Sequence, residues 1–226
     1  MKRKLLKLTF ILFIASMLTA CGKIKPKEQL LGINYNVEGH SYQLEKYETK
    51  NPLVALYIKN YGSVVIELYP EIAPNTVANF IHLVESGFYD NNTFHRLMKG
   101  FVLQGGDPTG TGSGNPGYRI KGEFNANGFT NNLKHDKAIV SMARTNLSYD
   151  SAGCQFFIML DKAEYLDGQY ASFGKVIDGW DTIVKIENNE KVIDYQTGKL
   201  KTNLTIVKAL VDLKGKAISD VEKIME

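Results

Sequence analysis

Short apolar runs bounded by turn residues recur along most of the chain. Each run is four to seven residues long, and the eight of them cover 53–58, 64–68, 93–97, 101–104, 138–142, 155–160, 171–176 and 204–210. Segments of this length suit β-strands, which are usually about five to six residues long, and are too short for stable helices. Many short strands separated by turns predict a mainly β protein, either a closed barrel or a sandwich.

Two stretches have helical spacing instead. In the first, apolar side chains fall at i, i+3, i+4 and i+7, namely Val77, Phe80, Ile81 and Val84. Pro74 before them and Gly87 after them suit the first turn and the end of a helix. Trp180, Ile183 and Ile186 indicate a second helix, so we expect two helices to accompany the strands.

The first twenty residues have the three parts of a secretory signal peptide. Four basic residues are followed by an apolar run over 8–18, and small residues then lead to Cys21. That run is too short for a membrane-spanning helix, which needs about 20 apolar residues. Residues 18–21, Leu-Thr-Ala-Cys, resemble the bacterial lipobox, in which signal peptidase II cuts before a cysteine that carries diacylglycerol. The resemblance implies that 1–20 are removed and that Cys21 becomes the lipidated N-terminus.

The expected lipid predicts where in the cell the protein is found and how the chain is divided into segments. Two acyl chains hold a protein stably on a membrane, whereas one does so only marginally. We therefore expect the protein on the extracytoplasmic face of the cell membrane. Residues 21–51 are polar and weakly patterned, which suggests a lipid-anchored tether with a short accessory segment. Residues 213–226 form a C-terminal tail whose apolar spacing allows a short helix or a frayed end.

The positive charge of the chain is concentrated in the signal peptide. Of its 27 basic residues, four lie there, which leaves 23 against 24 acidic residues. We therefore expect no nucleic-acid partner, because such a protein needs a basic surface.

Residues 112–117 spell G-x-G-x-x-G, but the pattern does not fit a nucleotide site. A dinucleotide site needs a helix directly after the turn, whereas Pro116 interrupts the pattern and 118–121 alternate like a strand. The four histidines lack metal-binding spacing, and Cys154 has no partner once Cys21 is lipidated. We therefore expect a surface loop at 112–117, and we expect the protein to have no metal, cofactor or disulfide. Composition leaves a Ser-His-Asp hydrolase open, although no G-x-S-x-G elbow is present.

Six blocks of sequence resemble the signature of the cyclophilin-type peptidyl-prolyl cis-trans isomerases, in the family's order and at its intervals. They are Phe94-His95-Arg96, Gly100-Phe101 with Gln104-Gly105-Gly106-Asp107, Ser141-Met142-Ala143, Gln155-Phe156-Phe157-Ile158, Leu166-Asp167-Gly168 and Phe173-Gly174-Lys175-Val176. The resemblance covers nearly all of the segment after the tether and implies one isomerase domain over 52–212. It also implies a closed eight-stranded antiparallel barrel capped by two helices.

The resemblance also assigns roles to individual residues. Arg96 corresponds to the catalytic arginine, with Phe101 and Gln104 beside it. The implied substrate-binding residues are Val102, Ala143, Arg144, Gln155, Phe157, Tyr165, Leu166 and Tyr170. Three of these differ from the family's common pattern in its eukaryotic members: Tyr165 replaces tryptophan, Tyr170 replaces histidine and Arg144 replaces asparagine. We expect catalysis to survive, because tyrosine keeps an apolar wall with a polar tip, but Tyr165 removes a usual contact for cyclosporin.

The resemblance implies an enzyme that speeds proline-limited folding of exported proteins. Its partners would be proline-containing unfolded or exported polypeptides, and we expect a monomer. An alternative is a non-catalytic chaperone or peptide-binding module that uses the same groove. A surface adhesin built on this barrel would need a role for 22–51 or for the tail, and their composition supplies none.

Overall fold

The computed structural model describes residues 35–37 and 40–225. The expected signal peptide over 1–20, the expected lipidation site Cys21 and the first part of the expected tether lie outside the described residues. Within the described part of the chain, no helix is both long enough and apolar enough to cross a bilayer.

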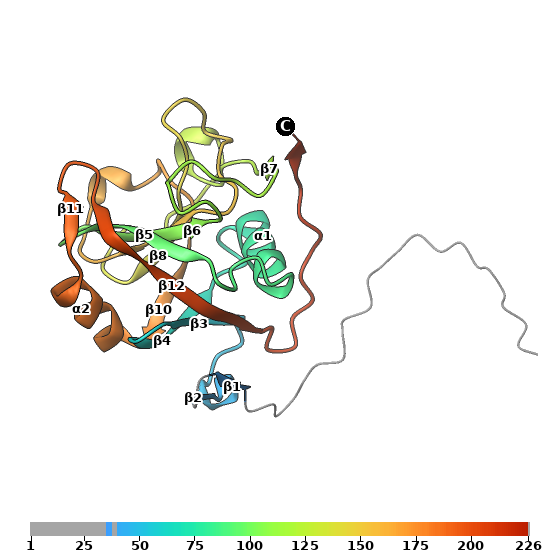
Figure 1. Ribbon diagram of the computed structural model, residues 1–226. Helices are drawn as coiled ribbons and strands as arrows, with labels where there is room; N and C mark the ends of the chain where they lie inside the picture. The colour runs from blue at the N-terminus through green and yellow to red at the C-terminus, as the bar shows by residue number, and fades with distance from the viewer. Residues whose placement is uncertain (1–34, 38–39, 226) are drawn as a thin grey trace, which may run out of the picture.

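Eight antiparallel strands close into a barrel (Figure 1). The strands are β3 (Leu53–Ile58), β4 (Gly62–Leu68), β5 (Thr93–Met98), β6 (Val102–Asp107), β8 (Ile139–Met142), β9 (Phe156–Met159), β10 (Ser172–Asp178) and β12 (Lys199–Asp212). Their order around the barrel is β12-β3-β4-β10-β8-β9-β6-β5, and pairing of β5 with β12 closes the ring. The expected barrel is therefore confirmed, and the sandwich is excluded.

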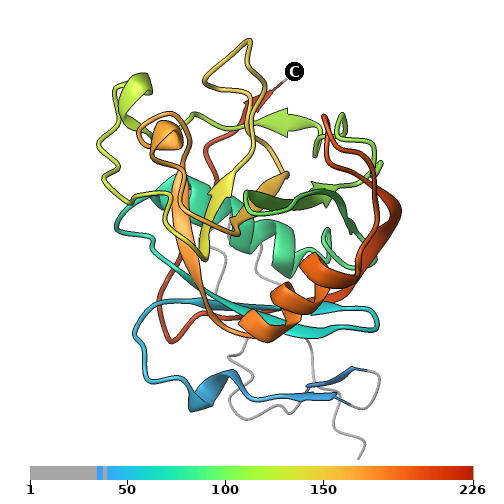
Figure 2. The same cartoon turned by 90° about the vertical axis from the view of Figure 1, so that its left-hand side faces the viewer.

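Helices α1 (Pro74–Glu85) and α2 (Trp180–Asn189) lie at opposite ends of the barrel, as the two views in Figures 1 and 2 show. Pro74 occupies the first turn of α1, as expected. Ala73 cannot cap the helix with its side chain, so the buried carboxylate of Glu123 does so from a distant loop. Its two oxygens accept the backbone N–H groups of Asn75 and Thr76 at 3.0 and 2.7 Å, two of the donors that a helix start leaves without partners.

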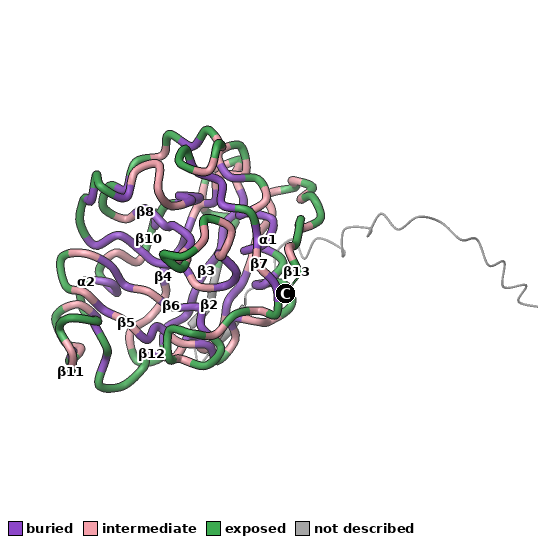
Figure 3. Tube along the Cα trace, turned by 90° about the horizontal axis from the view of Figure 1, so that it is seen from above, coloured by how far each residue is buried: buried purple, intermediate pink, exposed green. Residues whose placement is uncertain are grey.

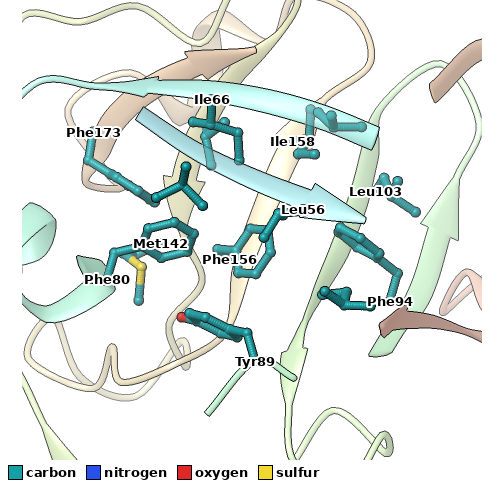
Figure 4. Close-up of a cluster of buried hydrophobic side chains, with 14 of the residues drawn as sticks. Leu56, Ile66, Phe80, Tyr89, Phe94, Leu103, Met142, Phe156, Ile158 and Phe173 are labelled. Atoms are coloured by element: carbon teal, nitrogen blue, oxygen red, sulfur yellow. The ribbon is translucent and has the colours of Figure 1, made fainter. Parts of the chain in front are cut away.

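Aromatic side chains fill the barrel between the strands and α1 (Figure 4). The ring of Phe156 meets those of Phe80, Tyr89 and Phe94 edge to face, with centroids 5.2, 5.5 and 5.6 Å apart. Each such pair contributes roughly 0.5–1.5 kcal/mol beyond the burial of its area. Figure 3 shows the result, with buried residues inside the barrel and exposed ones along the peripheral loops.

Short elements lie outside the barrel. They are β1 (Tyr35–Val37), β2 (His40–Tyr42), η1 (Leu44–Lys46), β7 (Tyr118–Arg119), η2 (Asn125–Asn127), η3 (Glu164–Leu166), β11 (Val192–Asp194) and β13 (Ile224–Met225). Strands β1 and β2 form a hairpin in the accessory segment, and β11 extends the sheet beyond the ring by pairing with β12. Residues 112–117 lie in a loop, as expected.

The C-terminal tail is extended, so the short helix considered for it is wrong. Residues Ile218 and Val221 pack against the core, and β13 pairs with β7 beyond α1 (Figure 1). The side chain of Asn75 exchanges two hydrogen bonds with the backbone of Glu222, at 3.0 and 2.8 Å. An isolated helix of this length is marginal in water, and here the extended backbone finds partners on the barrel instead.

Candidate active site

A second cluster of apolar side chains, called here the pocket cluster, lies on the outer face of the barrel over β6, β8, β9 and η3. Successive side chains of a strand point to opposite faces, so Leu103 and Ile158 enter the core whereas Val102 and Phe157 face outward. The buried members of this pocket cluster are Val102, Ile139, Phe157, Met159, Ala163 and Leu166, and the partly buried ones are Met98, Phe101, Leu133, Ala143 and Tyr170. This cluster is therefore separate from the core inside the barrel.

A chain of polar side chains runs along one side of this pocket. Nη1 of Arg96 donates to Oε1 of Gln104 at 2.8 Å, and Nε2 of Gln104 donates to Oε1 of Gln155 at 3.0 Å. Strand register explains the order, because Gln104 is the partner of Arg96 on β5 and of Phe157 on β9. Nε2 of Gln155 in turn donates to the carbonyl oxygens of Gly112 and Gly114, each at 3.0 Å.

The guanidinium of Arg96 is fixed by neutral acceptors alone. Its Nε donates to the backbone carbonyl of Thr197 at 2.8 Å, and its Nη2 contacts the sulfur of Met98. Burial lowers the pKa of Arg96 from its ordinary value of 12.5, but a guanidinium stays protonated in proteins. Among the described residues no carboxylate forms an ion pair with it. A positive charge that is not neutralised by a carboxylate in the described part of the chain therefore lies beside the pocket cluster.

His135 packs against two aromatic members of the pocket cluster. Its ring lies nearly parallel to that of Phe157, with centroids 6.1 Å apart, and meets Tyr170 edge to face at 6.4 Å. Nδ1 is 3.1 Å from the carboxylate of Asp167, and Nε2 is 3.2 Å from the hydroxyls of Ser141 and Ser172. Burial lowers the pKa of His135, so the ring is neutral at pH 7, with Nδ1–H donating to Asp167 and Nε2 accepting from the serines.

The remaining expected residues lie at the rim. Tyr165 is 71% exposed and stacks on Phe101, with centroids 6.0 Å apart. The backbone N–H of Ala143 donates to the carbonyl of Gln155 at 2.9 Å, and the guanidinium of Arg144 lies over the ring of Tyr170. The contacts described above therefore join all eleven residues expected from the sequence in one region on the outer face of the barrel.

Sequence reasoning missed four contributors to this site. Met98 and the carbonyl of Thr197 hold Arg96, while His135 and Asp167 support the pocket wall. Asp167 lies inside the signature block Leu166-Asp167-Gly168, so its position in the sequence could have indicated a role in the site. Thr197 offered none, because every residue carries a backbone carbonyl.

The family model of the cyclophilin type peptidyl-prolyl cis-trans isomerases (Pro_isomerase, CLD) matches residues 53–211. The chain belongs to this family. It is 44% identical over 133 residues to peptidyl-prolyl cis-trans isomerase B of Bacillus subtilis (strain 168), a match that covers 59% of this chain and 89% of that protein. It is also 37% identical over 152 residues to a peptidyl-prolyl cis-trans isomerase of Helicobacter pylori, covering 66% and 90%.

Longer relatives match only in part, and solved structures share the fold. The peptidyl-prolyl cis-trans isomerase-like 2 of Rhizopus delemar is 39% identical over 153 residues, which is 28% of its length. A cyclophilin of Cryptosporidium parvum, crystallised in the presence of the dipeptide Ala-Pro, has a TM-score of 0.62 and 35% identity, covering 70% of this chain and 98% of that one. The cyclophilin AquaCyp293 of Hirschia baltica has a TM-score of 0.58 and 27% identity, covering 78% and 82%.

This cyclophilin is therefore a peptidyl-prolyl cis-trans isomerase. The reaction is rotation about an X–Pro amide, which is slow because partial double-bond character sets a barrier of roughly 18–20 kcal/mol. No bond is broken, so the site needs to hold a proline ring and stabilise a twisted amide.

Proposed function

We propose that Arg96 is the catalytic residue of this isomerase and that Phe101 and Gln104 complete its immediate surroundings. The observation that carries the proposal is the fixed guanidinium, held by Gln104 and Thr197 at the edge of the apolar pocket without a carboxylate partner in the described part of the chain. Directed at the prolyl nitrogen, it favours the pyramidal nitrogen of the twisted amide over the planar one. Arginine suits the role because its donors are rigid and permanently charged.

The other residues bind the peptide. Val102, Phe157 and Leu166 would hold the proline ring, with Tyr165 and Tyr170 at the mouth of the pocket. Gln155 and the backbone carbonyl groups of Ala143 and Arg144 would lie along the extended chain on either side. Fixing the ring while the rest of the peptide turns is what converts binding into catalysis.

The test follows cis-to-trans relaxation of a short X–Pro peptide with wild type, Arg96→Ala and Arg96→Lys. We expect Arg96→Ala to lower kcat/KM by about 100-fold, the usual effect of removing one donor that stabilises a transition state. Arg96→Lys should recover only part of that loss, because lysine lacks the planar fork. Lys59→Ala, an exposed residue in the turn between β3 and β4, is the control. A folded wild type that binds peptide but accelerates nothing would instead indicate the non-catalytic binding module.

We also propose that the enzyme works on exported polypeptides from the extracytoplasmic face of the membrane, anchored through Cys21. The support is the sequence of 1–21, with its basic start, short apolar run and lipobox-like Leu-Thr-Ala-Cys. Cys21→Ser should abolish the mass increase of the N-terminal fragment and the partitioning of the protein into detergent. A wild-type protein whose N-terminus carries no lipid would overturn this proposal and leave the isomerase assignment intact.

A further inference from the structure

Arg144 is held in a cage of three aromatic rings at the rim of the groove. Its Cζ lies 5.4 Å from the ring centroid of Phe124, 4.9 Å from that of Tyr149 and 4.6 Å from that of Tyr170. Its Nε donates to the carbonyl of Gln169 at 3.0 Å, and its Nη1 donates to that of Thr145 at 2.9 Å. Five contacts therefore place this guanidinium at one position, and little conformational freedom remains to be lost when a ligand binds.

The positive charge of Arg144 has no carboxylate partner among residues 35–37 and 40–225. The acidic residues Asp150 and Asp167 on the same loops have other hydrogen-bond partners. Oδ1 of Asp150 accepts from the backbone N–H of Gly122 and from Asn127, at 3.0 and 2.7 Å. Asp167 forms an ion pair with Lys134 and accepts a hydrogen bond from the neutral ring of His135.

The guanidinium keeps hydrogen-bonding capacity beside these rings. Of its five N–H groups, two have acceptors in the described part of the chain. A planar guanidinium edge matches the two oxygens of a carboxylate, and such charge-assisted pairs are stronger than neutral ones. Water or an incoming acidic side chain can supply these acceptors, and the acidic side chain also neutralises the charge.

The position of the cage limits the distance between the substrate proline and an acidic side chain that contacts Arg144. The ring of Tyr170 is shared, because its centroid lies 4.6 Å from Cζ of Arg144 and 5.8 Å from the centroid of Phe157, so no more than about 10 Å separates the arginine from the pocket. An extended chain advances about 3.3–3.6 Å per residue. A residue within three positions of the proline therefore reaches the arginine.

We propose that Arg144 forms a subsite for an acidic side chain of the substrate, so that the enzyme prefers X–Pro bonds with Asp or Glu within three residues of the proline. The proposal rests on the placement of the proline pocket at Phe157. The aromatic cage would then hold the positive charge of Arg144 beside the bound substrate, in addition to packing the loop that carries Tyr149.

The test uses matched peptides that carry Glu, Gln or Lys at one position, scanned over three residues on each side of the proline. With the wild-type protein we expect kcat/KM for the Glu peptide to exceed that for the Gln peptide about fivefold at one position, the upper range for an exposed ion pair, and the Lys peptide to be slowest. Added salt should reduce this preference, because it screens exposed charges.

The variants are compared by the ratio of Glu to Gln rates within each protein, which cancels any general loss of activity or folded fraction. Arg144→Gln should bring the ratio to about one, and Arg144→Lys should retain part of it. Lys59→Gln removes a positive charge from the turn of β3 and β4, strands that lie across the barrel from β9 and β6, and should leave the ratio unchanged. A wild-type ratio near one at every position, or a ratio unaffected by Arg144→Gln, would overturn the inference. Absence of isomerisation for all peptides would instead overturn the proposed catalytic site.

Discussion

The Nε atom of Arg96 donates a hydrogen bond of 2.8 Å to the backbone carbonyl of Thr197, which lies 101 residues further along the chain. Thr197 belongs to the hairpin between β11 and β12, and the next carbonyl, that of Gly198, accepts the N–H of Leu97 at 2.8 Å. The hairpin between β11 and β12 thus pairs with β5 through Lys199 and orients the guanidinium of Arg96.

Gly198→Ala should therefore impair catalysis from outside the groove. Gly198 has a φ of +76°, and an added Cβ would lie 2.7 Å from Cγ of Met98 and 2.9 Å from the carbonyl oxygen of Leu97. We expect the hairpin to shift and kcat/KM to fall about tenfold, equivalent to about 1.4 kcal/mol of transition-state stabilisation.

Two comparisons isolate this effect. Gly128→Ala has a similar φ of +75° with nothing within 4 Å of the added Cβ, so it reports the cost of a left-handed alanine alone. In an Arg96→Ala background, Gly198→Ala should have no further effect on activity, since the group that it displaces is gone. If Gly198→Ala lowers kcat/KM equally in the wild-type and Arg96→Ala backgrounds, the hairpin does not act through the position of Arg96.

His135 should make folding stability depend on pH. Burial lowers its pKa in the folded protein below the ordinary value of 6.5, so the unfolded chain binds more protons below that pH. The free energy of unfolding should therefore fall as the pH drops through about 6.5. His95 acts in the same direction, because burial also lowers its pKa.

Urea unfolding of His135→Gln between pH 7 and pH 5 measures this contribution. We expect the variant to be less stable at pH 7 but to lose less stability on acidification than the wild type, with His95 responsible for part of the remaining slope. His82→Gln, which removes an exposed imidazole from α1, is the matched control. A slope identical to that of the wild type would rule out His135 as a source of the pH dependence.

Glu123→Gln should weaken the start of α1. The carboxylate accepts two backbone N–H groups of the first turn and is 4% exposed, and negative charge at a helix N-terminus is favourable. We expect the free energy of unfolding to fall by about 1–3 kcal/mol, because the amide replaces one acceptor with a donor. Thermal unfolding would measure the loss, with Glu85→Gln at the exposed end of α1 as control. Equal stability of the two variants would contradict the capping role.

Asn75→Ala should release the C-terminal tail. It removes both hydrogen bonds to the backbone of Glu222, and we expect about 1 kcal/mol of lost stability together with faster proteolysis between 215 and 225. Protease digestion followed by mass spectrometry would locate the cleavage. Unchanged cleavage in the tail would mean that Ile218, Val221 and β13 hold it without help.

The sequence by itself determined the local elements and the composition of the groove. The short apolar runs at 101–104 and 155–160 predicted strands, but both are almost continuously apolar, so which side chains enter the core was decided by the folded sheet. The signature blocks placed Arg96, Gln104 and Phe157 in one site, and the register of β5, β6 and β9 agrees with that grouping. The helices were predictable because the spacing of apolar residues along a helix is a local property of the sequence.

Only the tertiary structure decided what holds these parts in place. The pairing of β5 with β12, the capping of α1 by Glu123, the extended tail and the cage around Arg144 all join residues that lie far apart in sequence. The acceptor for Arg96 is the clearest case. A backbone carbonyl is the same chemical group at every residue, so no side-chain pattern distinguishes that of Thr197 until the folded chain brings it to the guanidinium.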